Sequence, residues 1–258
     1  MPTAAGLYYF VHGADDYTRP PVVLIHGAGG DHLYWPPQMR RLHQGRMFAV
    51  DLPGHGKSEG VGHHTIEDYA GEILGFLKAL KFSQAVLVGH SMGGAVALQA
   101  AIQAPRRVIG LGLLGSAARL RVNSTLLQTA ADPSKAGVAV HMVIEDSFAP
   151  GTSVRLKELA EKRLLDTRSS VLYGDFLACD AFDPGARPAK ISAPTLILFG
   201  QEDKMISPQA GKVLQNQIPG ARFELVPDAG HMVMLEQPDR VAELLSAFLK
   251  SVPYQPGK

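Results

Sequence analysis

Apolar residues along this chain gather in short runs that alternate with stretches of mixed hydrophobic and polar residues. Runs that are apolar throughout are typical of parallel strands covered on both faces. Such runs lie at 22–25, 47–50, 85–88, 108–114 and 193–199, and further strands are predicted at 6–13 and 222–226. Between them, a hydrophobic period of three to four residues predicts helices, most clearly at 66–80 and from Pro238 onward. The pattern therefore predicts an α/β fold with a mostly parallel central sheet flanked by helices.

The alternation of strand and helix stops in the middle of the chain. Two helices are predicted there, at 135–145 and 154–168, followed by an apolar but irregular stretch at 171–182. A segment of this length is too long for a simple connection between strands, so we expect an inserted helical cap. The expected division of the chain is a cap at 117–190 and one core made of 1–116 and 191–258.

The strand at 85–88 runs directly into Gly89-His90-Ser91-Met92-Gly93, which has the pattern G-x-S-x-G, and an alanine-rich stretch follows. A strand that turns sharply into a helix at this pattern places the serine at the apex with its hydroxyl exposed. Glycine on both sides allows the close backbone approach of the turn, while the serine is held in a strained conformation. A Gly-rich turn with a solvated serine is the alternative, but the flanking strand and helix favour Ser91 as a nucleophile.

A serine hydroxyl is a weak nucleophile at neutral pH, so it needs a base within hydrogen-bond reach and a third group that orients the base. His231 lies on the loop after the last predicted strand, where it can reach Ser91. The orienting acid must come from a strand end near this histidine. Three carboxylates are candidates: Glu202 and Asp203 after the preceding strand, and Asp228 in the turn that leads to the histidine.

Five segments, taken in order, resemble the motifs of the α/β-hydrolase fold family, and the likeness covers residues 6–250. They are Leu24-Ile25-His26-Gly27-Ala28-Gly29-Gly30, Asp51-Leu52-Pro53-Gly54-His55-Gly56-Lys57-Ser58, the G-x-S-x-G segment, Leu198-Phe199-Gly200-Gln201-Glu202-Asp203 and Ala229-Gly230-His231. The resemblance implies an α/β-hydrolase fold with a catalytic triad of Ser91, Asp203 and His231. The family pattern of a glycine, two residues and an aspartate selects Asp203 over Glu202.

Enzymes with this elbow stabilise the oxyanion with two backbone N–H groups. The resemblance implies that Met92, directly after the nucleophile, supplies one of them and that Ala28 supplies the other. Glycines after Ala28 permit a close approach of the backbone. The segment that contains Asp51 and His55 looks structural in relatives, so we expect neither residue to be catalytic.

These residues predict a serine hydrolase that cleaves carboxylic esters of small to medium, mostly apolar substrates through an acyl-enzyme on Ser91. This chemistry requires no metal and no organic cofactor. Similar triads also serve an enol-lactonase, a carbon–carbon bond hydrolase, a cofactor-free perhydrolase or haloperoxidase, and an aminopeptidase, and these alternatives stay open. A ligand-binding receptor on the same fold is the non-enzymatic alternative. The candidate walls of a pocket under the cap are large apolar residues that also suit a plain core: Trp35, Met142, Phe148, Phe176, Met205 and Met232.

The composition argues against nucleic acid and membrane partners, so the partner expected from the candidate triad is a small-molecule ester substrate. The 25 Lys and Arg residues nearly balance the 24 Asp and Glu residues, without a basic stripe, so we expect neither nucleic acid nor an anionic membrane as a partner. No apolar run reaches the about 20 residues that a transmembrane helix needs. The single cysteine, Cys179, excludes an internal disulfide, and the first residues lack a signal pattern, so a cytoplasmic location is expected. The sequence does not indicate whether the protein is a monomer or an oligomer.

Overall fold

One sheet of eight strands organises the part of the chain that the computed structural model describes, residues 2–13, 18–42 and 45–255. Its spatial order is β1-β2-β4-β3-β5-β6-β7-β8, with β1 and β2 antiparallel to their neighbours and the remaining strands parallel. The strands are β1 (Thr3–Ala4), β2 (Leu7–His12), β3 (Val22–Ile25), β4 (Met47–Val50), β5 (Ala85–His90), β6 (Val108–Leu114), β7 (Thr195–Gly200) and β8 (Arg222–Val226). The predicted, mostly parallel sheet is therefore present.

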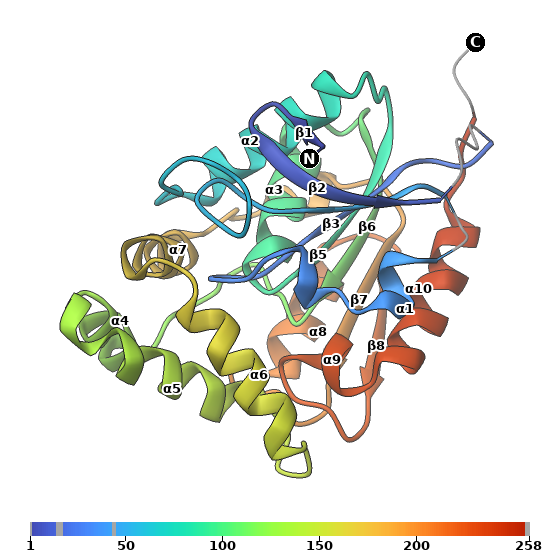
Figure 1. Cartoon of the computed structure of the whole chain (residues 1–258). Helices are drawn as coiled ribbons and strands as arrows, with labels where there is room; N and C mark the ends of the chain where they lie inside the picture. The colour runs from blue at the N-terminus through green and yellow to red at the C-terminus, as the bar shows by residue number, and fades with distance from the viewer. Residues whose placement is uncertain (1, 14–17, 43–44, 256–258) are drawn as a thin grey trace.

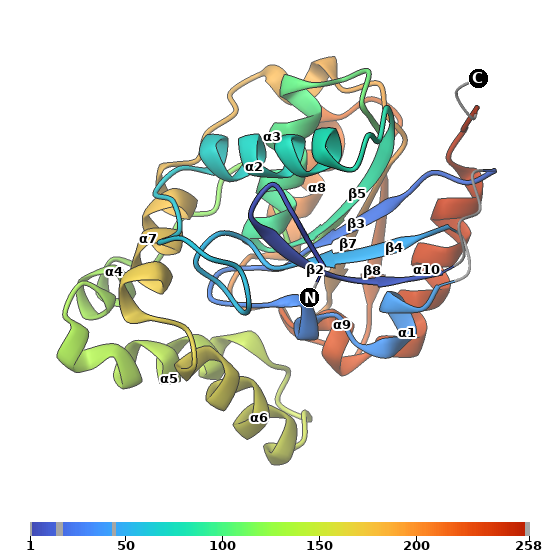
Figure 2. The same cartoon turned by 45° about the horizontal axis from the view of Figure 1, so that its top comes forward.

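Helices cover both faces of this sheet (Figures 1 and 2). Alternate residues of the central strands point to opposite layers: Val23 packs in the cluster with α2, α3 and α8, whereas Val22 packs in the cluster with α1 and α10. Burial on both faces explains why the central strands contain few polar residues. The helices of these layers are α1 (Pro37–Arg40), α2 (Ile66–Ala79), α3 (Met92–Gln103), α8 (Pro208–Gln217), α9 (Val233–Glu236) and α10 (Pro238–Ser251), and short 3₁₀ helices lie at His32–Tyr34, Pro133–Lys135 and Arg187–Lys190.

A helical insert lies between β6 and β7. It consists of α4 (Ser124–Ala130), α5 (Ala136–Ser147), α6 (Val154–Leu165) and α7 (Ser169–Ala181). Figures 1 and 2 place α4, α5 and α6 away from the sheet, while α7 contacts both α3 of the core and α4 of the insert. The insert agrees with the expected cap, and its limits at 117 and 190 stay a prediction.

The interpretation of residues 171–182 as irregular is wrong, because α7 runs through most of that stretch. Its buried residues include Val171, Leu172, Gly174, Asp175 and Phe176, which lie on several sides of the helix. A helix enclosed from several directions does not have the one-sided hydrophobic period that identifies surface helices in a sequence. The short helix α4 was not predicted either, and it begins after Asn123, whose side chain accepts a hydrogen bond from the Thr125 N–H.

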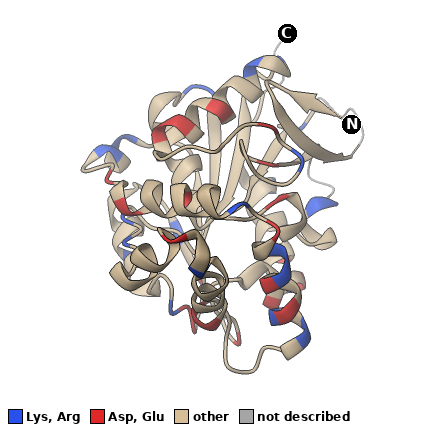
Figure 3. Cartoon of the chain, turned by 60° about the vertical axis from the view of Figure 1, so that its left-hand side comes forward, with Lys and Arg blue, Asp and Glu red and all other residues tan. Residues whose placement is uncertain are grey.

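Charged residues of both signs are interspersed on the side of the molecule that carries the insert (Figure 3). In the described part of the chain, no helix combines the length and the apolar character needed to cross a membrane.

Two glycines offer a test of how tightly the strand ends are packed. A Cβ atom at Gly200, at the end of β7, would lie 2.1 Å from the Gly230 carbonyl oxygen, whereas one at Gly71 in α2 would meet nothing within 4 Å. We expect Gly200→Ala to lower the free energy of unfolding by about 3 kcal/mol, because backbone must move. Gly71→Ala should raise it by about 0.5–1 kcal/mol, as alanine favours helix. Urea denaturation followed by circular dichroism measures both, and equal stability of Gly200→Ala and the wild type would contradict the described packing.

Candidate active site

Ser91 lies at the sharp turn between β5 and α3, as the G-x-S-x-G pattern predicts. Its backbone has φ 54° and ψ −120°, a conformation that costs a non-glycine residue about 1–3 kcal/mol. A Cβ atom at Gly89 would lie 2.0 Å from the Gly93 carbonyl oxygen, and one at Gly93 would lie 2.2 Å from that of Ile25. The turn therefore requires glycine at both positions. Ser91 lies at its apex, beyond the end of β5, and lines a cavity there.

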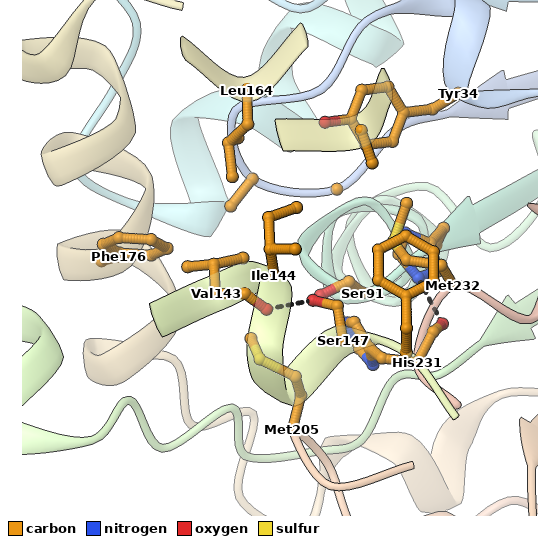
Figure 4. Close-up of a pocket in the computed structure, with 15 residues that line it drawn as sticks. Tyr34, Ser91, Val143, Ile144, Ser147, Leu164, Phe176, Met205, His231 and Met232 are labelled. Carbon is orange, nitrogen blue, oxygen red and sulfur yellow. Dashed lines mark hydrogen bonds between the residues drawn. The ribbon is translucent and has the colours of Figure 1, made fainter. Parts of the chain in front are cut away.

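The imidazole of His231 pairs with the carboxylate of Asp203. Nδ1 of His231 lies 2.9 Å from Oδ2 of Asp203, and the two side chains are 4% and 0% exposed. The other oxygen of Asp203 accepts a hydrogen bond from the Ile206 N–H at 2.9 Å, which fixes the carboxylate. With Nδ1–H donated to Asp203, Nε2 of His231 keeps its lone pair and can accept a proton. His231 and Ser91 line the same cavity (Figure 4).

Glu236, which has no recognisable sequence pattern, holds the loop that carries His231. One carboxylate oxygen accepts from the Gly230 N–H at 2.8 Å, and the other accepts from the Ala149 N–H at 2.8 Å and the Thr152 hydroxyl at 2.5 Å. Gly230 belongs to the histidine loop, whereas Ala149 and Thr152 connect two helices of the insert. A single carboxylate thus joins the core to the insert beside the candidate base.

His90, directly before Ser91, is bonded to the loop that carries His231. Its Nε2–H donates to the carbonyl oxygen of His231 at 2.9 Å. Burial, together with the nearby His231, lowers the pKa of His90 well below its ordinary value, so this imidazole is neutral at pH 7. Its Nδ1 has no hydrogen-bond partner among the described residues. His90 therefore positions the backbone of His231.

The two residues of the predicted oxyanion hole, Ala28 and Met92, both lie close to Ser91. Met92 is the first residue of α3, and Ala28 lines the cavity beside Ser91. A Cβ atom at Gly27 would lie 3.1 Å from Cβ of Ser91, so the loop after β3 runs directly past the serine. In the described part of the chain, neither the Ala28 nor the Met92 N–H takes part in a turn, loop or cap hydrogen bond. The positive end of α3 adds a favourable potential for an anion at this point.

Comparisons with known proteins identify the family of the chain. A sequence profile of the alpha/beta hydrolase family matches residues 22–244. The chain belongs to the alpha/beta hydrolase family. The predicted α/β-hydrolase fold is therefore confirmed, and the insert α4–α7 occupies the place of the expected cap.

Three relatives illustrate the similarity of this hydrolase to known proteins. It is 29% identical over 239 residues to 3-oxoadipate enol-lactonase 1 of Acinetobacter baylyi, and the alignment covers 90% of each chain. Its structure is similar to that of the enol-lactonase from Burkholderia xenovorans LB400, with a TM-score of 0.88, 27% identity, and coverage of 95% of this chain and 96% of that one. A thermophilic esterase from Thermogutta terrifontis gives a TM-score of 0.86 and 27% identity over 95% of this chain and 93% of that one.

Buried polar residues stabilise the loops of this alpha/beta hydrolase around the site. The carboxylate of Asp51 accepts hydrogen bonds from the N–H of His32 at 2.6 Å and from its Nδ1 at 2.8 Å, which lower the pKa of Asp51 although burial opposes this. His26 donates from Nδ1 to the Gly27 carbonyl oxygen at 2.8 Å and accepts at Nε2 from the Leu52 N–H at 3.0 Å. Burial lowers the pKa of His26 to about 4, so it stays neutral. These bonds give Asp51 and His26 a structural role.

The cavity beside Ser91 has mostly apolar walls (Figure 4). Four predicted wall residues line it, namely Phe148, Phe176, Met205 and Met232. Further lining residues that the sequence did not indicate are Tyr34, Val143, Ile144, Ser147, Ala160 and Leu164.

The structure does not bring the other two predicted wall residues to this cavity. Trp35 is 0% exposed and packs in the core cluster that also contains Met39. Met142 belongs to α5, whose residues Val143 and Ile144 face the cavity, and a turn of about 100° per residue directs Met142 elsewhere. The choice of pocket walls was therefore wrong for Trp35 and Met142.

A second, wider cavity adjoins Ser91 and Ala28 on the side of β6. Arg121, Lys204 and Asp146 contribute to its walls, next to apolar residues such as Phe176. Cys179 also lines it, and burial raises the pKa of this thiol well above its ordinary value. No group of three or more His, Cys, Asp or Glu residues in the described ranges is arranged to hold a metal ion.

Proposed function

We propose that this alpha/beta hydrolase cleaves carboxylic esters of small to medium, mostly apolar substrates through an acyl-enzyme on Ser91. One observation carries the proposal: His231, buried and paired with Asp203 at 2.9 Å, lines the same cavity as a serine in a strained strand-to-helix turn. A serine needs this combination of base and orienting acid to act as a nucleophile. The similarity to an esterase and to enol-lactonases supports the assignment of reaction class.

The reaction follows from the positions of these groups. Nε2 of His231 takes the proton of the Ser91 hydroxyl while its oxygen attacks the ester carbonyl carbon. The N–H groups of Ala28 and Met92 stabilise the negative charge that develops on the carbonyl oxygen. His231 then gives the proton to the departing alkoxide, and Asp203 stabilises the imidazolium in between. A water molecule, activated by His231, releases the acid and restores Ser91.

Both cavities bear on the substrate class. The cavity around Ser91 is lined by apolar side chains from the insert and the core, which suits an uncharged acyl chain. An enol-lactonase is the second candidate, because a lactone is a cyclic ester that the same groups would open. Arg121 and Lys204 contribute positive charge to the wall of the adjoining cavity, and Asp146 offsets one of these charges. The remaining positive charge favours binding of a lactone that carries a carboxylate.

Replacement of the nucleophile tests the proposal directly. Ser91→Ala removes only one oxygen, and alanine occupies the strained turn as serine does. We expect no measurable turnover of p-nitrophenyl esters, an unchanged circular dichroism spectrum, and labelling of the wild type but not of the variant by a serine-directed phosphonate. Equal labelling of both proteins would exclude Ser91 as the nucleophile.

The orienting acid is tested by a pair of matched substitutions. Asp203→Asn keeps the shape of the side chain but favours the wrong tautomer of His231, so kcat should fall by about 10⁴-fold. Asp228 is exposed and has φ 54°, a conformation that asparagine tolerates, so Asp228→Asn should change kcat by less than about twofold. Steady-state kinetics of the two variants decides between the carboxylates, and a reversed result would assign the role to Asp228.

The insert should determine the preferred acyl chain. Phe176 lines both cavities, so Phe176→Ala enlarges the space beside Ser91. We expect discrimination between acyl chains to change by about 1–3 kcal/mol in favour of longer chains. Phe223→Ala is the control, because Phe223 packs on Phe199 beside α8 and lines neither cavity. Values of kcat/KM for acetyl to decanoyl esters measure the shift, and an unchanged profile for Phe176→Ala would contradict the proposed pocket.

A further inference from the structure

A carboxylate of the insert is buried against the loop that carries Ala28. Asp175, on α7, is 0% exposed. Its Oδ2 accepts hydrogen bonds from the Gly29 N–H and from Nε2 of His55, both at 2.8 Å, and its Oδ1 accepts from the Tyr69 hydroxyl at 2.6 Å. Three donors from three separate segments of the core therefore converge on one side chain of the insert.

The same loop is held by the insert at a second point. The hydroxyl of Thr167, between α6 and α7, donates to the Gly29 carbonyl oxygen at 2.7 Å. Gly29 has φ +64°, and a Cβ atom there would lie 2.3 Å from Leu164 and 2.8 Å from Leu172, both residues of the insert. Both backbone polar groups of Gly29 are thus bonded to the insert. Side chains of the insert also fill the space that a side chain at Gly29 would need.

Hydrogen bonds on both sides of Ala28 restrict the direction of its N–H. Because a peptide unit is planar, the Ala28 N–H points opposite to the Gly27 carbonyl oxygen. That oxygen is held by Nδ1 of His26 at 2.8 Å and by the Gly30 N–H at 3.1 Å. The next peptide unit ends in the Gly29 N–H, which Asp175 holds. The core therefore fixes one side of Ala28, and the insert fixes the other.

His55 explains why the acceptor is a charged carboxylate. Its Nδ1 lies 3.0 Å from the Pro53 carbonyl oxygen, which can only accept, and its Nε2 donates to Asp175. Both ring nitrogens then carry protons, so His55 is an imidazolium. Burial by itself would lower the pKa of His55, but the charge and hydrogen bond of Asp175 outweigh it and raise the pKa. The negative charge of Asp175 is balanced inside the protein, and the carboxylate is free to accept from Gly29.

We propose that Asp175 and Thr167 are positioning residues through which the insert sets the oxyanion hole. The proposal rests on the proposed function, because it concerns the same site. It adds that the insert acts on the rate of the chemical step through Ala28, in addition to selecting the acyl chain. Loss of either residue lowers kcat by a similar factor for every ester, since the oxyanion is common to all of them.

Two variants and two matched controls test this proposal. Asp175→Asn places an amide NH₂ against a donor, and Thr167→Val removes the hydroxyl while keeping the shape. Asp180→Asn changes a carboxylate of the same helix that accepts from the Val122 N–H at 3.1 Å. Thr129→Val removes a hydroxyl that bonds only within α4, to the Thr125 carbonyl oxygen at 2.8 Å. In the described part of the chain, the hydrogen bonds of both control side chains go to residues outside the loop that carries Ala28.

The measurements are kcat and KM for acetyl to decanoyl p-nitrophenyl esters, and the inhibition constant of an aryl trifluoromethyl ketone. Ser91 adds to the ketone carbon, its proton passes to His231, and the ketone oxygen becomes an oxyanion in the hole. We expect Asp175→Asn and Thr167→Val to lower kcat about 10-fold at all chain lengths and to raise the inhibition constant of the ketone by the same factor. This effect is smaller than the 10²–10³-fold loss of kcat on removal of a whole oxyanion donor. KM should change less than about twofold, Thr167→Ser should restore kcat, and both controls should behave as the wild type.

Each other outcome points to a different error. If the wild type neither turns over esters nor reacts with a serine-directed phosphonate, the proposed function fails, and this proposal fails with it. If the wild type is active but Asp175→Asn and Thr167→Val lose only thermal stability, with kcat and ketone inhibition unchanged, only the positioning role is overturned. A loss confined to some chain lengths overturns it as well, because that result assigns both residues to acyl selection. Thr167→Val decides the question where Asp175→Asn does not fold.

Discussion

The parallel register of the sheet is the constraint on which the site depends. Ile25 at the end of β3 pairs with Gly89 of β5. Gly89 pairs in turn with Leu113 of β6, and Leu113 pairs with Ile197 of β7. Because parallel strands present their carboxyl ends at one edge, the loops after β3, β5, β7 and β8 meet there. These loops carry Ala28, Ser91, Asp203 and His231. Residues far apart in sequence are therefore brought together by backbone hydrogen bonds before any side chain of the site contributes.

Close backbone contact at that edge then converts proximity into a defined geometry. Gly93 lies against the end of β3 so tightly that a Cβ atom would collide with Ile25, and Gly200 lies in the same way against the loop of His231. The strained conformation of Ser91 is maintained because β5 and residues 92–101 of α3, on either side of it, are buried. Free energy from the packed core thus compensates for strain at the nucleophile.

Local patterns explain how much could be predicted from sequence. The strands and the turn at Ser91 have short-range signatures, and His231 follows a strand end, so the sequence pattern predicts them directly. The choice of Asp203 over Glu202 required the resemblance to the α/β-hydrolase family. Asp175 was not found, since its partner Gly29 is 146 positions away and a single aspartate in an apolar helix has no pattern of its own. The error at Trp35 has a related cause: a large apolar residue predicts burial, but tertiary packing decides which cavity or core it faces.

Buried or half-buried carboxylates hold the insert to the core at two places, Asp175 on α7 and Glu236, which accepts hydrogen bonds from the connection between α5 and α6. Separation of α7 from the core would break the buried hydrogen bonds of Asp175 to His55, Gly29 and Tyr69. A hydrogen bond to a charged group contributes about 1.5–3 kcal/mol. The ion pair between α6 and the core, Arg163 with Asp31 at 3.6 Å, lies at the surface and contributes at most about 1 kcal/mol. Side chains of α5 that line the cavity, such as Val143 and Ile144, can adjust to different acyl chains without breaking the bonds of Asp175 or Glu236. Because α7 stays in place, the loop that presents the Ala28 N–H need not move when the wall adapts.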